Sequence, residues 1–116
     1  MRALINGVEG GSRTIFKGQD LVLLVQVLND DGSLITVTGD TVSLMLFDRI
    51  DRANAAILTI TAAITTAAAG FTTATVTDTQ TGTLAAGATY YAFVRRDAAT
   101  AGAFSFADNY TVVYVK

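Results

Sequence analysis

Three oxygen-bearing side chains lie close together in a polar stretch and are the best candidates for metal chemistry. Asp48, Asp51 and Asn54 could supply carboxylate and amide oxygens to one calcium ion, which prefers oxygen ligands. Arg49 and Arg52 alternate with them and would repel a cation, and the spacing does not follow the EF-hand pattern. We therefore expect no metal and no other cofactor.

The groups that usually perform acid–base and nucleophilic catalysis are scarce. The sequence contains no His and no Cys, so it lacks the commonest general base and the most nucleophilic side chain. None of its serines lies in a G-x-S-x-G context. The adjacent carboxylates of Asp30 and Asp31 precede Gly32, which is typical of a hairpin turn. We expect the chain not to be an enzyme.

The composition indicates a single domain that is covered in part by other subunits. The 116 residues are 51% hydrophobic and only 16% charged, with mean hydropathy +0.44 and net charge −2. So few charges solvate a small domain poorly, which predicts self-association as a trimer or dimer, or docking onto a larger shell. The alternative is that the hydrophobic excess is mostly alanine, which exposes little area.

Two partner classes are not expected. The eight basic residues are scattered and outnumbered by ten acidic ones, which argues against nucleic acid. The longest apolar run, Leu21–Leu28, contains Gln26 and is too short to span a membrane. The absence of Cys fits synthesis in a reducing cytoplasm.

Short stretches of β-branched and aromatic residues alternate with turn residues along the chain and predict seven or eight strands. The run Leu21–Leu28 is nearly continuous in apolar residues, which favours a strand buried on both faces. We expect an all-β, antiparallel sandwich, with the jelly roll as the alternative. The expected strands are 13–16, 21–28, 34–37, 41–47, 57–61, 71–77, 89–97 and 110–115.

Two connections are harder to assign. Within residues 55–69 the isoleucines have helical spacing, but the segment Ile57–Thr61 is rich in β-branched residues. We interpret Ile57–Thr61 as a strand and Thr65–Gly70 as a loop. The polar stretch Asp78–Thr83 is compatible with one helical turn that has Asp78 as its N-cap.

The most informative pattern is the spacing of Leu84, Gly87 and Tyr90, which leads directly into an alternating strand. Tyr90, Ala92 and Val94 are expected on one face of that strand. This arrangement is typical of the corner between strands E and F of a β-sandwich, where the tyrosine hydroxyl bonds to upstream backbone. The three residues are predicted to be structural.

We expect the chain to consist of a flexible arm at residues 1–12 and one sandwich domain at residues 13–116. The glycines at positions 7, 10 and 11 suggest the flexible arm, and we expect Leu4 and Ile5 to lie outside the sandwich. Candidate interaction residues are Arg2, Leu4 and Ile5 in the arm and Arg49 and Arg52 in the sandwich, together with the tip Ala98–Ala103.

The corner at Leu84–Tyr90 resembles that of fibronectin type III domains, with Ala86 where that family usually has Pro. The order of features from about residue 14 onwards is similar to the immunoglobulin-like modules of tailed-bacteriophage virions. These include N-terminal domains of baseplate upper proteins and capsid decoration or cement proteins. The matching segments are Phe16-Lys-Gly-Gln-Asp20, Asp31-Gly32, Thr38-Gly39 and Leu84-x-x-Gly87-x-x-Tyr90-Tyr91.

The resemblance implies a non-enzymatic virion protein, made in the host cytoplasm, that binds and stabilises the shell of the major capsid protein. One alternative is a baseplate or tail module. Another is a host-attachment module that binds carbohydrate. Tyr90, Tyr91, Tyr110 and Tyr114 could form an aromatic surface for it, but their period-two placement favours packing in the core or on a sheet face.

Overall fold

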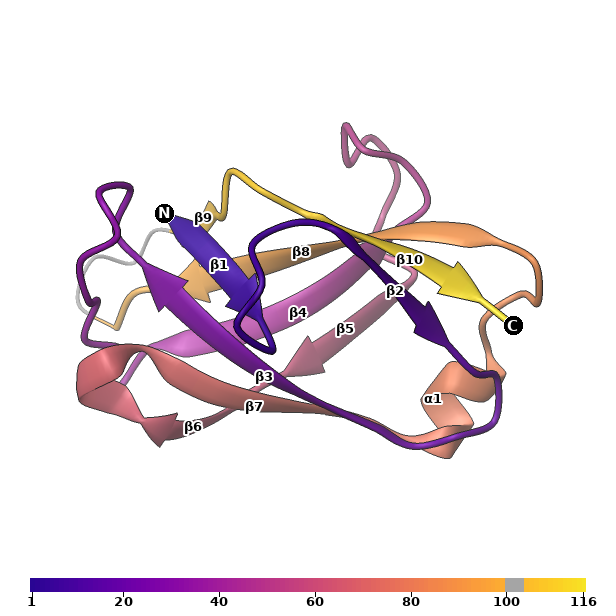
Figure 1. The fold of residues 1–116 in the computed structure, drawn as a ribbon, viewed down its shortest axis with the longest axis horizontal. Coiled ribbons are helices and arrows are strands. Elements are labelled where there is room, and N and C mark those ends of the chain that lie inside the picture. The colour runs from indigo at the N-terminus through magenta and orange to yellow at the C-terminus, as the bar shows by residue number, and fades with distance from the viewer. Residues whose placement is uncertain (100–103) are drawn as a thin grey trace.

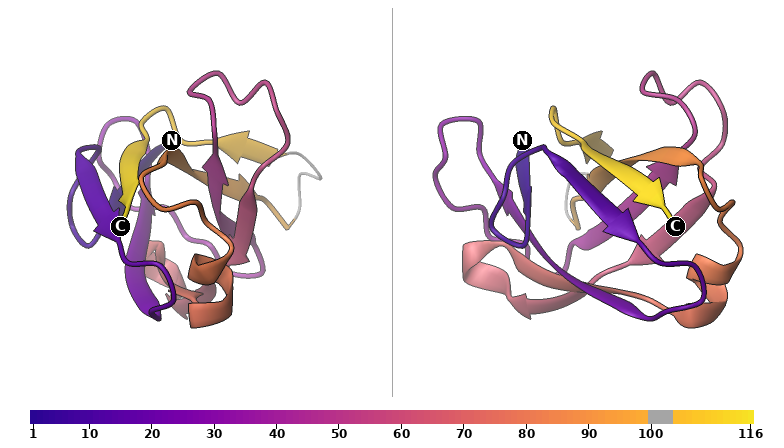
Figure 2. Two further views of the ribbon diagram at one scale, coloured as in Figure 1. Left: turned by 90° about the vertical axis from the view of Figure 1, so that its right-hand side faces the viewer. Right: turned by 45° about the vertical axis from the view of Figure 1, so that its right-hand side comes forward.

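The chain folds as a sandwich of two β-sheets that pack face to face (Figures 1 and 2). The structure is a computed structural model and describes residues 1–99 and 104–116. The first sheet contains, in order, β1 (Arg2–Ile5), β3 (Leu21–Leu28), β7 (Phe71–Val76) and β6 (Ala63–Thr66). The second contains, in order, β2 (Ser12–Ile15), β10 (Thr111–Val115), β8 (Thr89–Asp97), β4 (Thr41–Phe47) and β5 (Leu58–Thr61).

Three short elements complete the fold. Strand β9 (Phe104–Phe106) pairs with the end of β8, beside the stretch that pairs with β10. A 3-10 turn, η1 (Ala67–Ala69), joins β6 to β7, and a short helix, α1 (Asp78–Gly82), joins β7 to the corner before β8. Among the described residues, no helix has the length and the apolar character needed to cross a bilayer.

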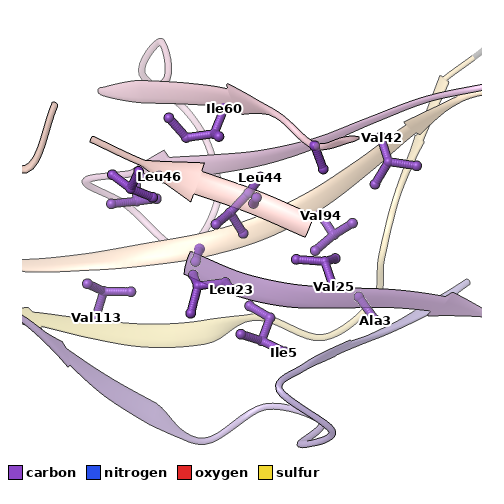
Figure 3. Packing of buried hydrophobic residues seen from close by; sticks show 14 of the residues in the cluster. Ala3, Ile5, Leu23, Val25, Val42, Leu44, Leu46, Ile60, Val94 and Val113 are labelled. Atoms are coloured by element: carbon purple, nitrogen blue, oxygen red, sulfur yellow. The ribbon is translucent and has the colours of Figure 1, made fainter. Parts of the chain in front are cut away.

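The core lies between the two sheets and is built from inward-facing residues, which alternate along the strands of both sheets (Figure 3). Leu44 and Val94 lie opposite each other on β4 and β8, and both are almost completely buried. Leu23 and Val25 of β3 contribute from the other sheet. The alternation predicted for β8 is observed, because Tyr90, Ala92 and Val94 are all buried in this core.

The all-β sandwich predicted from the sequence is confirmed, but it has more strands than expected. The described residues form ten strands rather than seven or eight. Residues 63–66 form β6 on the edge of the first sheet, although residues 65 and 66 are part of the predicted loop Thr65–Gly70. Conversely, residues 34–37 form no regular strand, although Ile35 and Val37 are buried and Leu34 makes one bridge to Leu28.

Residues 1–12 are not a free arm. Residues 2–5 form β1, which pairs antiparallel with β3, and Ala3 and Ile5 are buried in the core. The glycines that suggested a flexible arm instead make turns. Gly10 and Gly11 adopt φ +72° and +79°. These turns carry the chain across to the second sheet, where β2 pairs parallel with β10.

The prediction that β3 is buried on both faces is also wrong. Val22 and Leu24 are 60% and 41% exposed, while Leu23 and Val25 on the opposite face are buried. Leu4, Gln26 and Phe71 lie beside the exposed pair on the outer face of the first sheet and are half-buried. A nearly continuous apolar run therefore forms a strand with one buried and one partly exposed face.

The helical turn after β7 is present, with a different cap. Thr77, not Asp78, is the N-cap: its hydroxyl accepts a hydrogen bond from the Gln80 N–H at 3.2 Å. The Gln80 side chain accepts a hydrogen bond from the Thr77 N–H at 2.9 Å, which completes a capping box. Thr81 of this turn donates to the Gln19 carbonyl and so holds α1 against the β2–β3 connection.

Candidate functional site

The corner before β8 has the geometry of a tyrosine corner. Leu84 is fully buried, and Gly87 adopts φ +82°, which a glycine reaches without strain. The Tyr90 hydroxyl accepts a hydrogen bond from the Ala85 backbone N–H at 3.2 Å. Gly87 in turn donates its N–H to the Val115 carbonyl at 2.8 Å, so the corner is joined to the last strand. The corner positions strands and presents no reactive group.

The five residues proposed for interaction fall into three separate environments. Arg2 and Leu4 lie on the outer face of the first sheet, and Arg2 forms an ion pair with Glu9. Ile5 is only 6% exposed and cannot contact a partner without unfolding β1. Arg49 and Arg52 belong to the 48–57 loop at the second sheet (Figure 2). The tip Ala98–Ala103 lies largely outside the described residues.

The central part of the outer face of the first sheet carries no charged side chain, and the charged residue Arg2 lies at the end of the edge strand β1. Register places Leu24 beside Thr73, Val22 beside Thr75, and Gln26 beside both Leu4 and Phe71. Directly opposed residues in an antiparallel pair point to the same side, so these side chains form one surface. We call it the apolar sheet face and define it by Leu4, Val22, Leu24, Gln26, Phe71, Thr73 and Thr75.

The outer face of the second sheet is aromatic and packed within itself. Phe47 and Phe93 make an edge-on contact with ring centres 5.8 Å apart, and Phe106 lies 6.1 Å from Phe47. Tyr110 lies 5.3 Å from Phe93 and also contacts Tyr91. Although they point away from the sandwich core, Phe47 and Phe93 are only 5% and 3% exposed. We call these five residues the aromatic cluster.

Arg52 covers this cluster with its guanidinium. The Arg52 Cζ atom lies 4.6 Å from the Phe93 ring centre and 4.3 Å from that of Phe106, which is a cation–π arrangement. Arg52 adopts φ +54°, an uncommon backbone conformation for a residue with a side chain. The strained backbone directs the long side chain back over the rings.

Internal pairs shape the loop that carries Arg52. Arg49 donates to both carboxylate oxygens of Asp51, at 3.1 and 2.9 Å, and this contact lowers the pKa of Asp51 and raises that of Arg49. Asn54 donates its amide to the Asp48 carboxylate at 3.2 Å. The carboxylates of Asp48 and Asp51 are thus directed at nitrogen donors. Among the described residues, no group of three or more His, Cys, Asp or Glu side chains could hold a metal ion.

Both arginines of β8 are paired with acids, in different ways. Arg96 donates to Asp40 at 2.7 Å, and the Asp40 side chain is only 6% exposed. Burial opposes ionisation of Asp40, but the hydrogen bonds from the Ala99 N–H and from Arg96 outweigh it and lower its pKa. Arg95 pairs with Asp97 and lies 3.9 Å from the Phe104 ring centre.

The four tyrosines proposed for a sugar-binding surface do not form one. Tyr90 lies in the sandwich core, and Tyr91 and Tyr110 pack edge-on against each other with ring centres 5.8 Å apart. Tyr114 is 47% exposed on β10. Sequence reasoning missed the phenylalanines of the aromatic cluster. Phe93 could have indicated this cluster, because the alternation of its strand places it on the face opposite the core.

No protein-family model matches the chain. No curated protein matches it either.

Proposed function

We propose that this chain is a non-enzymatic virion structural protein of a tailed phage, and that it decorates the capsid by binding the shell of the major capsid protein. The observation that carries the proposal is the apolar sheet face. Val22 and Leu24 are 60% and 41% exposed side by side on β3, with only uncharged neighbours in register. Such a surface is favourable when it is covered by another protein.

The strand order supports an immunoglobulin-like sandwich, as the sequence resemblance implies. If β1, β3, β7 and β6 are taken as strands A, B, E and D, the first sheet has the order of that fold. Strands β10, β8 and β4 then correspond to G, F and C, with β5 as an additional strand beside C. This order favours the immunoglobulin-like arrangement over the jelly roll.

The aromatic cluster supports a structural role over carbohydrate binding. A sugar-binding platform needs aromatic ring faces that are open to solvent. Here Arg52 lies over two of the rings, and Phe47 and Phe93 are buried. The cluster therefore stabilises the 48–57 loop, and docking is assigned to the apolar sheet face. A baseplate or tail location remains the alternative within the same class, because the same face could dock there.

The test compares virions produced with the gene intact and with the gene deleted, followed by addition of purified chain. We expect the chain to co-sediment with heads and to restore their resistance to heat. Leu24→Lys should abolish rebinding, because it places a charge in the interface. Tyr114→Lys is the matched control, since Tyr114 is similarly exposed, at 47%, on the opposite sheet. Co-sedimentation with tails alone would favour the baseplate alternative, and absence from particles would overturn the proposal.

A further inference from the structure

Strand β5 forms an unprotected edge of the second sheet. It pairs with β4 on one side, and no other strand among the described residues pairs with it. Thr59 and Thr61 are exposed, and Ile57 just before the strand is 45% exposed. Proteins usually protect such edges with Lys, Pro or charged side chains. The stretch from Ala53 to Thr77 contains none of these.

The hydrogen bonds of β5 show which backbone groups are free. Ala62 donates its N–H to the Val42 carbonyl at 2.8 Å. In an antiparallel pair the bonded residues alternate, so Ile60 also directs its N–H and C=O toward β4. The N–H and C=O groups of Thr59 and Thr61 therefore point outward, away from the sheet. They form a short template for another strand.

The absence of charge along β5 favours a second copy of this chain as the partner that pairs with this edge. When two identical strands pair antiparallel about a two-fold axis, each edge meets its own copy. Any charge would then face a like charge, which is unfavourable. The edge strands β1 and β2 carry Arg2 and Arg13. The edge strand β6 is uncharged, but its register shifts between Ile64 and Thr66, an irregularity that disfavours edge pairing, whereas β5 carries only Leu, Thr and Ile in regular register. Two β5 edges can therefore pair with each other without bringing like charges together.

We propose that β5 pairs antiparallel with β5 of a second copy, which joins two second sheets into one continuous sheet across a two-fold axis. The inference goes beyond the proposed function and gives a structural form to the self-association that the composition predicts. The pairing leaves the apolar sheet face uncovered, because that face belongs to the other sheet. A dimer joined in this way would present two docking faces to a shell.

Sedimentation velocity of the full chain tests this pairing. The wild-type chain is expected to sediment as a dimer of 12.1 kDa chains. Thr61→Pro removes one outward N–H and no bond to β4, so it should give a monomer with an unchanged sheet. Thr59→Lys should also give a monomer, because two lysines would meet across the axis. Thermal denaturation checks that both variants are folded.

The control is Thr89→Lys, the same type of change at an exposed threonine on the internal strand β8. It should remain a dimer. A wild-type monomer or trimer, or a dimer that survives both edge substitutions, would overturn the β5 pairing. Particle binding is measured separately. A monomer that still decorates heads would refute this inference alone, and a dimer that never binds particles would refute the proposed function alone.

Discussion

The hydroxyl oxygen of Tyr90 accepts a hydrogen bond from the backbone N–H of Ala85, five residues earlier, at a distance of 3.2 Å. The bond connects the start of β8 to the turn that follows α1. The tyrosine hydroxyl thus satisfies a backbone donor. Loss of the hydroxyl would leave the partly buried N–H of Ala85 without a protein partner.

Tyr90→Phe is expected to destabilise the fold by about 1 kcal/mol, because it removes this single acceptor and little apolar contact. Urea denaturation gives the change in the free energy of unfolding. Tyr114→Phe is the control, since Tyr114 is 47% exposed and should be neutral. An unchanged midpoint for Tyr90→Phe would show that the corner does not depend on the hydroxyl.

Gly70 is expected to tolerate no side chain. It adopts φ +72°, and a Cβ atom there would collide with the Val27 carbonyl oxygen. Gly87 has φ +82° with open space around it, so Gly87→Ala carries only the backbone strain, about 1–2 kcal/mol. Gly70→Ala should lower the free energy of unfolding by clearly more than Gly87→Ala. Equal effects in thermal denaturation would contradict the close approach of Gly70 to β3.

The Asp40–Arg96 ion pair should make stability depend on acid pH. The pKa of Asp40 is lowered in the folded state, so its contribution is present above the unfolded value of about 3.9 and is lost as the pH falls through the lower folded value. Asp40→Asn should cost about 1–3 kcal/mol near neutral pH. The difference from wild type should shrink in acid, as measured by urea denaturation across a pH series. A difference that is constant with pH would contradict the role of the carboxylate charge.

Arg52→Ala should loosen the aromatic cluster. The guanidinium contacts two phenylalanine rings, and losing a cation–π contact of this kind costs about 0.5–1 kcal/mol. Arg49→Ala is the matched control in the same loop, since its pair with Asp51 is exposed and expected to contribute little. Chemical denaturation of both variants gives the comparison. Equal losses would mean that Arg52 does not act through the rings.

Local pattern predicted the parts of the fold in which one face of a strand is buried. The alternation predicted from Tyr90 to Val94 is observed, and Val42, Leu44 and Leu46 of the predicted strand 41–47 are also all buried, because period-two patterns report burial directly. The nearly continuous apolar run Leu21–Leu28 carries no such signal. Only the pairing of β3 between β1 and β7 reveals that Val22 and Leu24 point outward.

The candidate surfaces depend on contacts between distant segments, which a single sequence does not report. Phe47 and Phe106 come from strands far apart in the chain and meet only because β4 and β9 both pair with β8. The prediction of an arm was wrong for a related reason. Ala3 and Ile5 alternate over too few residues to indicate a strand, and β1 is ordered by its pairing with β3.

The apolar sheet face is the central element of the proposed function, and a cryo-electron microscopy map of virions carrying the chain tests it most directly. We expect density for the sandwich on the outside of the head, with Val22 and Leu24 of β3 buried against a capsid subunit and the 48–57 loop facing solvent. A map in which the apolar sheet face points to solvent, or in which heads carry no such density, would contradict the proposed function.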